Sequence, residues 1–529
     1  MGFKLLIKNK FISTVFGTLS LYFGIAFILP LNTLSVYITS YIHLDDKSVT
    51  MHHGLFIHLF FSFGTSFSLP LGGYLENILG FFETIIFGYI IVFIANLIFI
   101  FQQNIWICYF LSLALGMGVG ISASLLGKNI TFYAPNKKGI ISGVMGLGVG
   151  IITSLFGFAG EKIINFDGIT LKEDDNYYPP EIARNTYLYF IIGECFIPIG
   201  LIFALLLIYE YKPEDNNHDK SNLKKNEDER IDIKEKNEDK NEDKNEEKNI
   251  ENNEKKDEEK NEEKNKEKNE EKIEEKKDEE NEEKNEEEKE KENEFKKDSK
   301  RRVKQVIKTL RFYRLALASF LINISISFLI NTARTFGALI GINGNALQFI
   351  GILQILVVII AGPGLGYVVD KKGPLLIVRI IVLSCIIPPI LLTFFMTNDY
   401  VFISCLAIYI LNIIGISVSL GPYIMEVYGI QESVILGGII SGFAKLSDIS
   451  TTVSAFIFSL ICDNEKDCLK IKYAYAYFIS GICCVISSLL MLIEKNEKFK
   501  YYTASINKKL IDNEKEDLKD NQDKDYKEI

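Results

Sequence analysis

The sequence predicts an all-α membrane protein with twelve transmembrane helices arranged as two six-helix bundles. Of its 529 residues 48% are hydrophobic, and the mean hydropathy is +0.15 although one long stretch consists almost entirely of Lys, Glu, Asp and Asn. The apolar residues gather in segments of about 20 residues or more, the length that a bilayer requires. Six such segments precede the charged stretch and six follow it. The predicted spans are residues 12–39, 54–75, 83–102, 106–133, 140–163, 187–210, 315–338, 346–369, 375–397, 400–424, 434–461 and 474–493.

The charged stretch divides the chain into four predicted parts. The whole chain has a formal net charge of −10, but residues 213–300 hold 38 acidic and 24 basic side chains, so the rest is net positive. The stretch repeats Lys-Asn-Glu-Glu and close variants, and it is too polar to bury a core. It is either a tolerated insertion or a partner-binding element. The predicted parts are an N-terminal six-helix bundle (1–211), a charged low-complexity cytoplasmic linker (212–307), a C-terminal six-helix bundle (308–495) and a charged cytoplasmic tail (496–529).

Lysines in the short loops predict the orientation of the chain. Short cytoplasmic loops are enriched in Lys and Arg. Three groups of lysines fall on one side of the membrane if both termini are cytoplasmic, and we predict that orientation. The membrane is expected to be the plasma membrane, with an organellar membrane as the alternative. The lysines are Lys4, Lys8 and Lys10 before the first span, Lys137 and Lys138 after the fourth, and Lys371 and Lys372 after the eighth.

Several function classes are not favoured by this composition. No basic patch with interleaved aromatic residues indicates a nucleic-acid partner. The eight cysteines include no Cys-x-x-Cys pair, and no nucleophile–base set or metal-ligand cluster stands out, so we predict neither an enzyme nor a metal or cofactor site. Cys462 and Cys468 bracket a short polar loop. They are either a disulfide, if that loop faces an oxidising space, or two unpaired thiols.

The loop between the eighth and ninth spans carries the most specific local pattern, which runs from Gly366 through Asp370 and Lys371 to Gly373. Gly366 lets two helices approach closely, Asp370 can pair with a helix end or a basic group, and Gly373 makes the turn. An ion pair that forms in one of two states biases the equilibrium between them. The loop is therefore a candidate latch between conformations, and the alternative is an ordinary charged turn.

The equivalent loop of the first half, between the second and third spans, has a related pattern. Gly73 and Gly80 have the same spacing as the two glycines of the second-half loop, with Asn77 at the position of the acid. Related loops in two halves indicate the internal repeat that is common in transporters. Both loops are similar to the Gly-x-x-x-Asp-(Arg/Lys)-x-Gly signature of the major facilitator superfamily, and only the second matches it fully. The resemblance implies the facilitator fold and secondary transport, with a weakened latch in the first half.

A second region narrows the resemblance. Gly116, Gly118 and Gly120 in the fourth span precede a turn, Pro135-Asn-Lys-Lys-Gly139. Small residues allow tight packing of membrane helices, and the turn is rigid and cationic. The region resembles the corresponding stretch of oxalate:formate antiporters and monocarboxylate transporters. This branch implies a small carboxylate as the substrate.

The eleventh span contains the strongest candidate for a substrate contact. Lys445 lies about twelve residues into the span, or about 18 Å at 1.5 Å per residue, which is near the middle of the bilayer. A charge there is costly and generally faces a cavity or a partner. The oxalate:formate group, which this span resembles, has a lysine that contributes to binding the substrate carboxylate. The alternative is a structural ion pair, because Asp448 follows at i+3.

One position departs from that branch. The oxalate:formate group has an arginine four residues before the glycine that opens the loop signature, and this chain has Gly362 there. Without that second fixed cation a dianion such as oxalate is disfavoured, and a singly charged carboxylate fits better. Arg334 in the seventh span is a candidate substitute, although it lies toward the outer end and can instead extend to the interface.

Two residues are candidates for proton coupling. Glu194 in the sixth span is a carboxylate within the membrane, and burial would suit it to carry a proton. The alternative is a carboxylate held near the outer interface. His58 in the second span is the weaker candidate for the same task.

The sequence as a whole predicts a monomeric secondary active transporter of a small organic anion, a monocarboxylate, that works by alternating access, with proton coupling as an option. Its partners are expected to be the substrate and membrane lipid. Two alternatives are open. One is a transporter of amino acids or other zwitterions, in which Lys445 and Asp448 bind the two ends. The other is a membrane sensor or scaffold that has lost transport.

Overall fold

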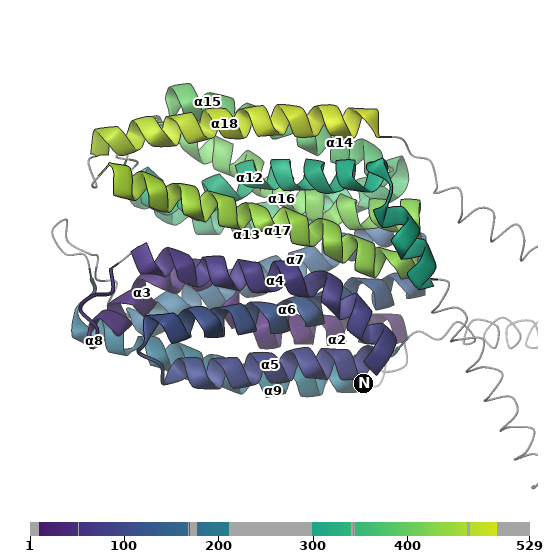
Figure 1. Cartoon of the computed structure of the whole chain (residues 1–529), viewed down its shortest axis with the longest axis horizontal. Helices are drawn as coiled ribbons and strands as arrows, with labels where there is room; N and C mark the ends of the chain where they lie inside the picture. Colours follow the sequence, from purple (N-terminus) through teal and green to yellow (C-terminus); the bar gives the residue numbers. More distant parts are fainter. Residues whose placement is uncertain are drawn as a thin grey trace, which may run out of the picture. The chain divides into compact units, whose positions relative to one another are not determined.

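The structure is a computed structural model of the whole chain, and it describes residues 10–50, 52–167, 169, 177–210, 299–339, 342, 344–462 and 466–494 (Figure 1). Within these residues every regular element is a helix, which confirms the predicted all-α class. The predicted linker up to residue 298 and the predicted tail lie outside the described residues. Residues 299–307, at the end of the predicted linker, form a helix.

The helices fall before and after the linker, as the sequence predicts. Those before it are α2 (Lys10–Ile25), η1 (Ala26–Ile28), α3 (Leu31–His43), α4 (His52–Leu79), α5 (Phe81–Ile100), α6 (Ile105–Tyr133), α7 (Lys138–Ile164), α8 (Pro180–Arg184) and α9 (Thr186–Leu207). Those after it are α12 (Leu310–Leu339), α13 (Gly344–Lys372), α14 (Pro374–Ser384), α15 (Ile387–Phe395), α16 (Asp399–Tyr428), α17 (Ile430–Ile461) and α18 (Lys466–Ile493).

Eleven segments of the described residues are long and apolar enough to cross a membrane. They cover every predicted span except the eighth, and that span forms the 29-residue helix α13. Several helices are longer than predicted. The 32 residues of α17 extend about 48 Å, whereas the hydrocarbon core of a bilayer is about 30 Å thick. The ends of such helices therefore project beyond the core or the helices tilt.

Two predicted spans are interrupted at prolines. The first span is divided into α2 and α3, with Pro30 directly before α3. The ninth is divided into α14 and α15, with Pro388 and Pro389 in the first turn of α15. Proline has no N–H to donate and its ring collides with the preceding turn, so a proline suits the start of a helix. Other prolines of this chain lie inside helices, in α4, α9, α13 and α16.

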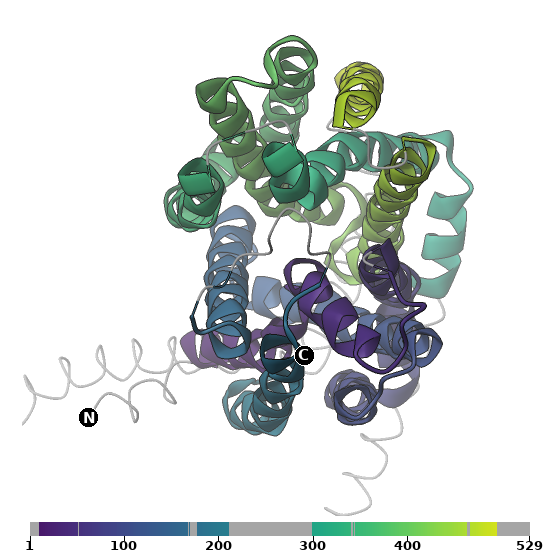
Figure 2. The same ribbon diagram turned by 90° about the vertical axis from the view of Figure 1, so that its left-hand side faces the viewer.

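Each half of the chain has its own apolar core. One cluster of buried side chains comes from residues 21–208 with the single addition of Val434, and another comes from residues 303–491. Figure 2 views the helices nearly end-on and shows the first half gathered below the second. The halves meet mainly where α4 packs against α17 and where α7 packs against α13.

One side of the membrane-crossing helices carries both ends of the described chain. α2 begins and α18 ends there (Figure 1). We call it the terminus side and the other the opposite side. Since successive spans alternate in direction, α4 and α13 end on the terminus side, and α7 and α17 begin there.

Candidate functional site

The predicted pair Lys445 and Asp448 lies halfway along α17. Lys445 Nζ is 3.3 Å from Asp448 Oδ2, an ion pair at i,i+3 on one face of the helix. The two side chains differ in burial, because 52% of the Lys445 side chain is exposed against 7% of that of Asp448. The lysine side chain is thus half exposed, while the aspartate side chain is enclosed by protein.

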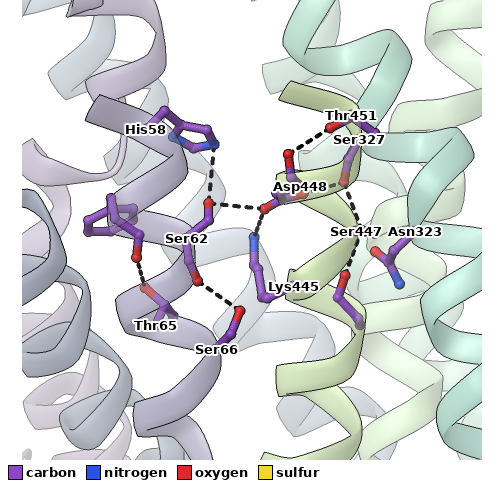
Figure 3. Close-up of polar contacts among 12 residues, drawn as sticks. His58, Ser62, Thr65, Ser66, Asn323, Ser327, Lys445, Ser447, Asp448 and Thr451 are labelled. Atoms are coloured by element: carbon purple, nitrogen blue, oxygen red, sulfur yellow. Dashed lines mark hydrogen bonds and ion pairs between the residues drawn. The ribbon is translucent and has the colours of Figure 1, made fainter. Parts of the chain in front are cut away.

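Asp448 is held by three helices. Its Oδ2 accepts a hydrogen bond of 3.3 Å from Ser62 Oγ of α4, and its Oδ1 accepts one from Ser327 Oγ of α12. Figure 3 shows the carboxylate between the two serines, with Lys445 extending from α17 toward α4. Because α4 belongs to the first half and α12 and α17 to the second, the hydrogen bond from Ser62 crosses between the bundles. A buried carboxylate needs such donors to remain ionised.

His58 completes this network from α4. Its Nε2 lies 3.4 Å from Ser62 Oγ, one helical turn away (Figure 3). The Nδ1 atom is buried and has no hydrogen-bond partner among the described residues. Of the two predicted proton-coupling candidates, His58 is therefore the one that the structure brings to Asp448.

The network lies between two contacts of α4 with α17. On the terminus side, a Cβ atom on Gly442 would lie 2.5 Å from the carbonyl oxygen of Ser66, and one on Gly438 would lie 2.8 Å from that of Leu69. Only glycine allows the backbones to come so close. On the opposite side the rings of Phe56 and Phe456 meet edge to face, with centroids 4.8 Å apart. The pair Lys445–Asp448 is therefore flanked on both sides.

α7 and α13 cross in a similar way on the terminus side. A Cβ atom on Gly139 would lie 2.5 Å from the carbonyl oxygen of Gly366, and the converse distance is also 2.5 Å. One turn further along, a Cβ atom on Gly143 would overlap the carbonyl oxygen of Gly362. Gly366, predicted to permit close helix approach, thus meets a glycine of the other bundle.

The loop that contains Asp370 binds a helix end. Asp370 Oδ1 accepts a hydrogen bond of 2.6 Å from the backbone N–H of Gly139, and Oδ2 accepts one of 2.9 Å from that of Ile140. The first N–H groups of a helix have no partner within the helix, and a negative charge at that end is stabilising. Asp370 supplies both the partner and the negative charge at the start of α7. Lys371 lies over the ring of Tyr367, 5.6 Å from its centroid, and Gly373 turns the chain into α14 with φ of +89°.

In the first-half loop the residue at the position of Asp370 is bonded within its own helix. Asn77 Nδ2 donates a hydrogen bond of 3.0 Å to the carbonyl oxygen of Gly73 on its own helix, and Gly80 makes the turn with φ of +106°. The start of α17, which corresponds to the start of α7, instead has its own acid, the buried Glu432. Glu432 forms an ion pair of 3.2 Å with Arg302. The two halves therefore supply the negative charge at the equivalent helix ends differently.

Of the two remaining predicted site residues, Glu194 lies apart from this network and Arg334 is described by its backbone alone. Glu194 of α9 accepts a hydrogen bond of 2.6 Å from Asn96 Nδ2 of α5, so its contact is within the first half. Glu194 Oε1 is buried without a hydrogen-bond partner among the described residues. Arg334 is part of α12, but its side chain is outside the described residues.

Sequence reasoning missed the two serines that hold Asp448. A serine in an apolar helix usually donates to the carbonyl oxygen one turn back, as Ser66 does to Ser62. Nothing in the sequence distinguishes Ser62 and Ser327 from such residues. The sequence does show a weaker pattern, because the i,i+4 spacing of His58, Ser62 and Ser66 puts three polar groups on one face of α4.

The comparisons with known proteins agree with this architecture. The family model described as Major Facilitator Superfamily matches residues 14–451. A search of curated protein sequences finds no significant match.

Solved transporter structures share the fold at low sequence identity. The E. coli fucose:proton symporter superposes with a TM-score of 0.56 at 12% identity, covering 93% of this chain and 100% of its own. A proton:xylose symporter superposes with a TM-score of 0.57 at 13% identity, covering 92% and 96%. The human organic anion transporter TETRAN superposes with a TM-score of 0.55 at 12% identity, covering 89% and 98%. The chain is a multi-pass membrane protein that belongs to the major facilitator superfamily of transporters.

Proposed function

We propose that this chain is a secondary transporter of a small organic anion with a single carboxylate, and that it works by alternating access. The observation that carries the proposal is the half-exposed side chain of Lys445, halfway along α17. Within the described residues, Lys445 forms its ion pair with Asp448. A charge at that depth is costly unless it serves a ligand or a partner.

A substrate carboxylate can replace Asp448 as the partner of Lys445. Asp448 would keep the hydrogen bonds from Ser62 and Ser327, so its charge would remain stabilised after Lys445 turns to the substrate. Lys445 would gain a second anionic contact from its exposed side. One fixed cation matches one carboxylate, which is why we propose a monocarboxylate and not a dianion.

The position of the site suits alternating access. Lys445 lies between the glycine contacts of α4 with α17 on the terminus side and the Phe56–Phe456 contact on the opposite side. Opening either contact exposes the ammonium to one side only. The hydrogen bond from Ser62 to Asp448 joins the bundles directly at the site, so substrate binding acts on the contact that must change between states.

A zwitterion such as an amino acid is the second candidate, because Lys445 and Asp448 present opposite charges 3.3 Å apart. It is less favoured because Asp448 is 7% exposed and already accepts hydrogen bonds from two serines. The ammonium of a zwitterion would have to displace them. We therefore rank the simple carboxylate first.

The test is saturable uptake of labelled lactate, formate and pantothenate into proteoliposomes that contain the full chain. A hydrogen bond between two charged groups contributes about 1.5–3 kcal/mol. Lys445→Gln is therefore expected to raise the half-saturating concentration about 10-fold to 100-fold. Lys470→Gln is the matched control, because it removes a lysine paired at i,i+3 with Asp467 outside this network. It should transport as the wild type does.

The outcomes separate the candidates. Competition by unlabelled monocarboxylates and not by neutral amino acids supports the proposal, and the reverse pattern supports the zwitterion. Uptake by the Lys445→Gln variant with an unchanged half-saturating concentration would refute the role of Lys445. No saturable uptake of any small anion or amino acid by the wild type would favour a protein that has lost transport.

A further inference from the structure

The segment that leads into α12 has an unusual charge. Residues 300–314 contain seven Lys and Arg and no acidic residue, directly after the acidic linker. The segment is amphipathic, because Val303 and Val306 are buried in the core of the second half, while Lys304 and Lys308 are exposed. The face that the valines leave open is therefore basic.

This face is fixed to the bundle. Arg302 pairs with Glu432 at the start of α17, and Thr309 Oγ1 accepts a hydrogen bond of 3.3 Å from the N–H of Phe312 at the start of α12. Lys304 and Lys308, by contrast, form no ion pair with any residue that the structure describes. Two lysines held one turn apart on a fixed segment form a surface of defined position.

Exposed apolar side chains follow the basic face directly along the chain. Leu310 is 79% exposed and Tyr313 is 51% exposed, both in the first turn of α12. Arg314, on the same turn, is partly exposed and is held by Glu494. Tyrosine is enriched at the level of the lipid headgroups, and clusters of Lys and Arg next to a transmembrane helix bind anionic lipids.

We propose that Lys304 and Lys308, with Leu310 and Tyr313 beside them, bind the headgroup and upper acyl chain of an anionic phospholipid in the terminus-side leaflet. The lysines would contact the phosphate, and Leu310 and Tyr313 would contact the chain. The acidic linker is the alternative occupant, because its carboxylates could neutralise Lys304 and Lys308. It has few apolar residues, however, to cover Leu310 and Tyr313. An anionic lipid supplies both a negative charge for the lysines and an acyl chain for the apolar side chains, so lipid is the occupant that the surface favours.

The test uses a fluorescent reporter at the site. The chain has a single tryptophan, Trp106, at the start of α6 on the opposite side. In the full chain with Trp106→Phe and Tyr313→Trp, fluorescence reports only on position 313. Brominated phosphatidylcholine or brominated phosphatidylglycerol in reconstituted vesicles quenches this tryptophan according to the occupancy of each lipid.

The expected result is a preference for phosphatidylglycerol over phosphatidylcholine of about five-fold for each lysine engaged, since a basic residue near an anionic surface contributes about 1 kcal/mol. Lys304→Gln with Lys308→Gln should reduce the preference toward one. Lys304→Arg with Lys308→Arg should retain it. Lys470→Gln with Lys472→Gln removes the same charge from the opposite side and should leave it unchanged.

Two results would overturn the proposal. One is equal quenching by the two lipids in the reporter protein, which is also the result if the acidic linker occupies the face. The other is a preference that survives removal of both lysines. The arginine variant changes both side chains but keeps the charge, so a preference retained there and lost in the glutamine variant assigns the effect to the charge. Quenching of the reporter tryptophan by brominated phosphatidylcholine that is unchanged in the glutamine variant shows that its fold is intact.

Discussion

Gly362 and Gly143 meet where α13 crosses α7, and this contact explains the departure at position 362. A Cβ atom on Gly362 would lie 2.9 Å from the carbonyl oxygen of Gly143. A larger side chain, such as the arginine that the sequence resemblance implies at this position, would collide with α7 in this conformation. Position 362 thus allows α13 and α7 to pack closely, and Lys445 is the cation of the proposed site.

The same contact predicts a sharp difference between two glycines of α7. In Gly143→Ala the new methyl group overlaps the carbonyl oxygen of Gly362, so the terminus side cannot close in this way and the rate of uptake should fall at least several-fold. Gly146→Ala is the matched control, because a Cβ atom there meets nothing within 4 Å. The measurement compares the initial rates of uptake by the two variants at equal protein content in the membrane. Equal rates in both variants would show that the crossing of α7 and α13 does not limit transport.

His58 and Glu194 differ in where they lie, and this predicts which of them carries proton coupling. His58 contacts Ser62, which binds Asp448 beside Lys445, whereas Glu194 contacts Asn96 within the first half. If uptake is stimulated by an inward proton gradient, His58→Gln should abolish the stimulation and Glu194→Gln should preserve it. The measurement is uptake with and without the gradient at a fixed external pH. Loss of stimulation in Glu194→Gln alone would assign the role to Glu194.

The sequence was sufficient to predict the charged part of the site and not the polar part. The i,i+3 spacing of Lys445 and Asp448 determines that they share a face of one helix, and the length of the span determines their depth. Ser62 and Ser327 reach Asp448 only because α4, α12 and α17 pack together. Tertiary packing of that kind has no local pattern, so these serines, like Gly143 opposite Gly362, could be found only in the structure.

At the scale of elements, the start of α7 depends on a residue of the other bundle. Asp370 accepts two hydrogen bonds from the N–H groups of Gly139 and Ile140 and so joins α13 to α7. This contact gives physical content to the proposed latch, because it joins the two bundles directly on the terminus side. The equivalent Asn77 bonds to its own helix, so the proposed latch rests on the second copy.

Substitutions at these two positions should therefore have unequal effects. Replacing a capping side chain with alanine costs about 0.5–2 kcal/mol. Asp370→Ala is expected to shift the equilibrium away from the closed terminus side by that amount, whereas Asn77→Ala should change it little. Labelling of a single cysteine introduced at Gly146 by a membrane-impermeant thiol reagent measures this equilibrium. Faster labelling in Asp370→Ala than in Asn77→Ala is expected, and the opposite order would contradict the proposed latch.

Four helices of the second half are joined at their terminus-side ends by Glu494, which directly follows α18. Its side chain is 2% exposed and accepts hydrogen bonds from Arg311, from Arg314 at 2.8 Å and from Tyr423 of α16 at 2.8 Å. Arg379 of α14 donates to the carbonyl oxygens of Glu494, Met491 and Leu492. Burial raises the pKa of the Glu494 carboxyl, but the hydrogen bonds from Arg314, Tyr423 and Arg311 outweigh it and hold the pKa below its usual value.

This lowered pKa predicts how stability depends on pH. A carboxyl group whose pKa is lower in the folded state contributes stability above its unfolded pKa, about 4.3, and loses it as the pH falls through the folded value. Glu494→Gln should therefore lower the thermal unfolding temperature in detergent at pH 7 by several degrees. The difference from the wild type should shrink below about pH 4.3. A difference that stays constant from pH 7 to pH 3.5 would contradict this account.

At the scale of the whole molecule, the fold followed from the sequence because membrane spans have a strong signal. An apolar segment of bilayer length must be helical, since every backbone N–H and C=O needs a partner inside the membrane. The helix ends were less predictable. α18 begins at Lys466, eight residues before the predicted span, because polar residues such as Lys470 extend the helix beyond the apolar segment. The prolines that divide the first and ninth spans are present in the sequence, but both predicted spans run through them without a break.

The orientation of the chain remains a prediction with one new support. Cys462 and Cys468 form a disulfide in the structure, with Cα atoms 5.5 Å apart, where the sequence alone also allowed two thiols. This bridge joins α17 to α18 on the opposite side. Because disulfides persist in oxidising compartments, the bridge supports the proposal that the opposite side faces the exterior or an organelle lumen and that both termini are cytoplasmic.

The central claim is that a positive charge at position 445 binds the carboxylate of the transported anion. It is tested most directly by Lys445→Cys in a Cys195→Ser background, which removes a free cysteine that is exposed. The variant is treated with a thiol reagent that adds either an ethylammonium group or an uncharged group of similar size. Uptake of the labelled monocarboxylate should be lost in the variant, restored by the ammonium reagent and not by the neutral one. Equal uptake after both reagents, or wild-type uptake before either, would contradict the claim.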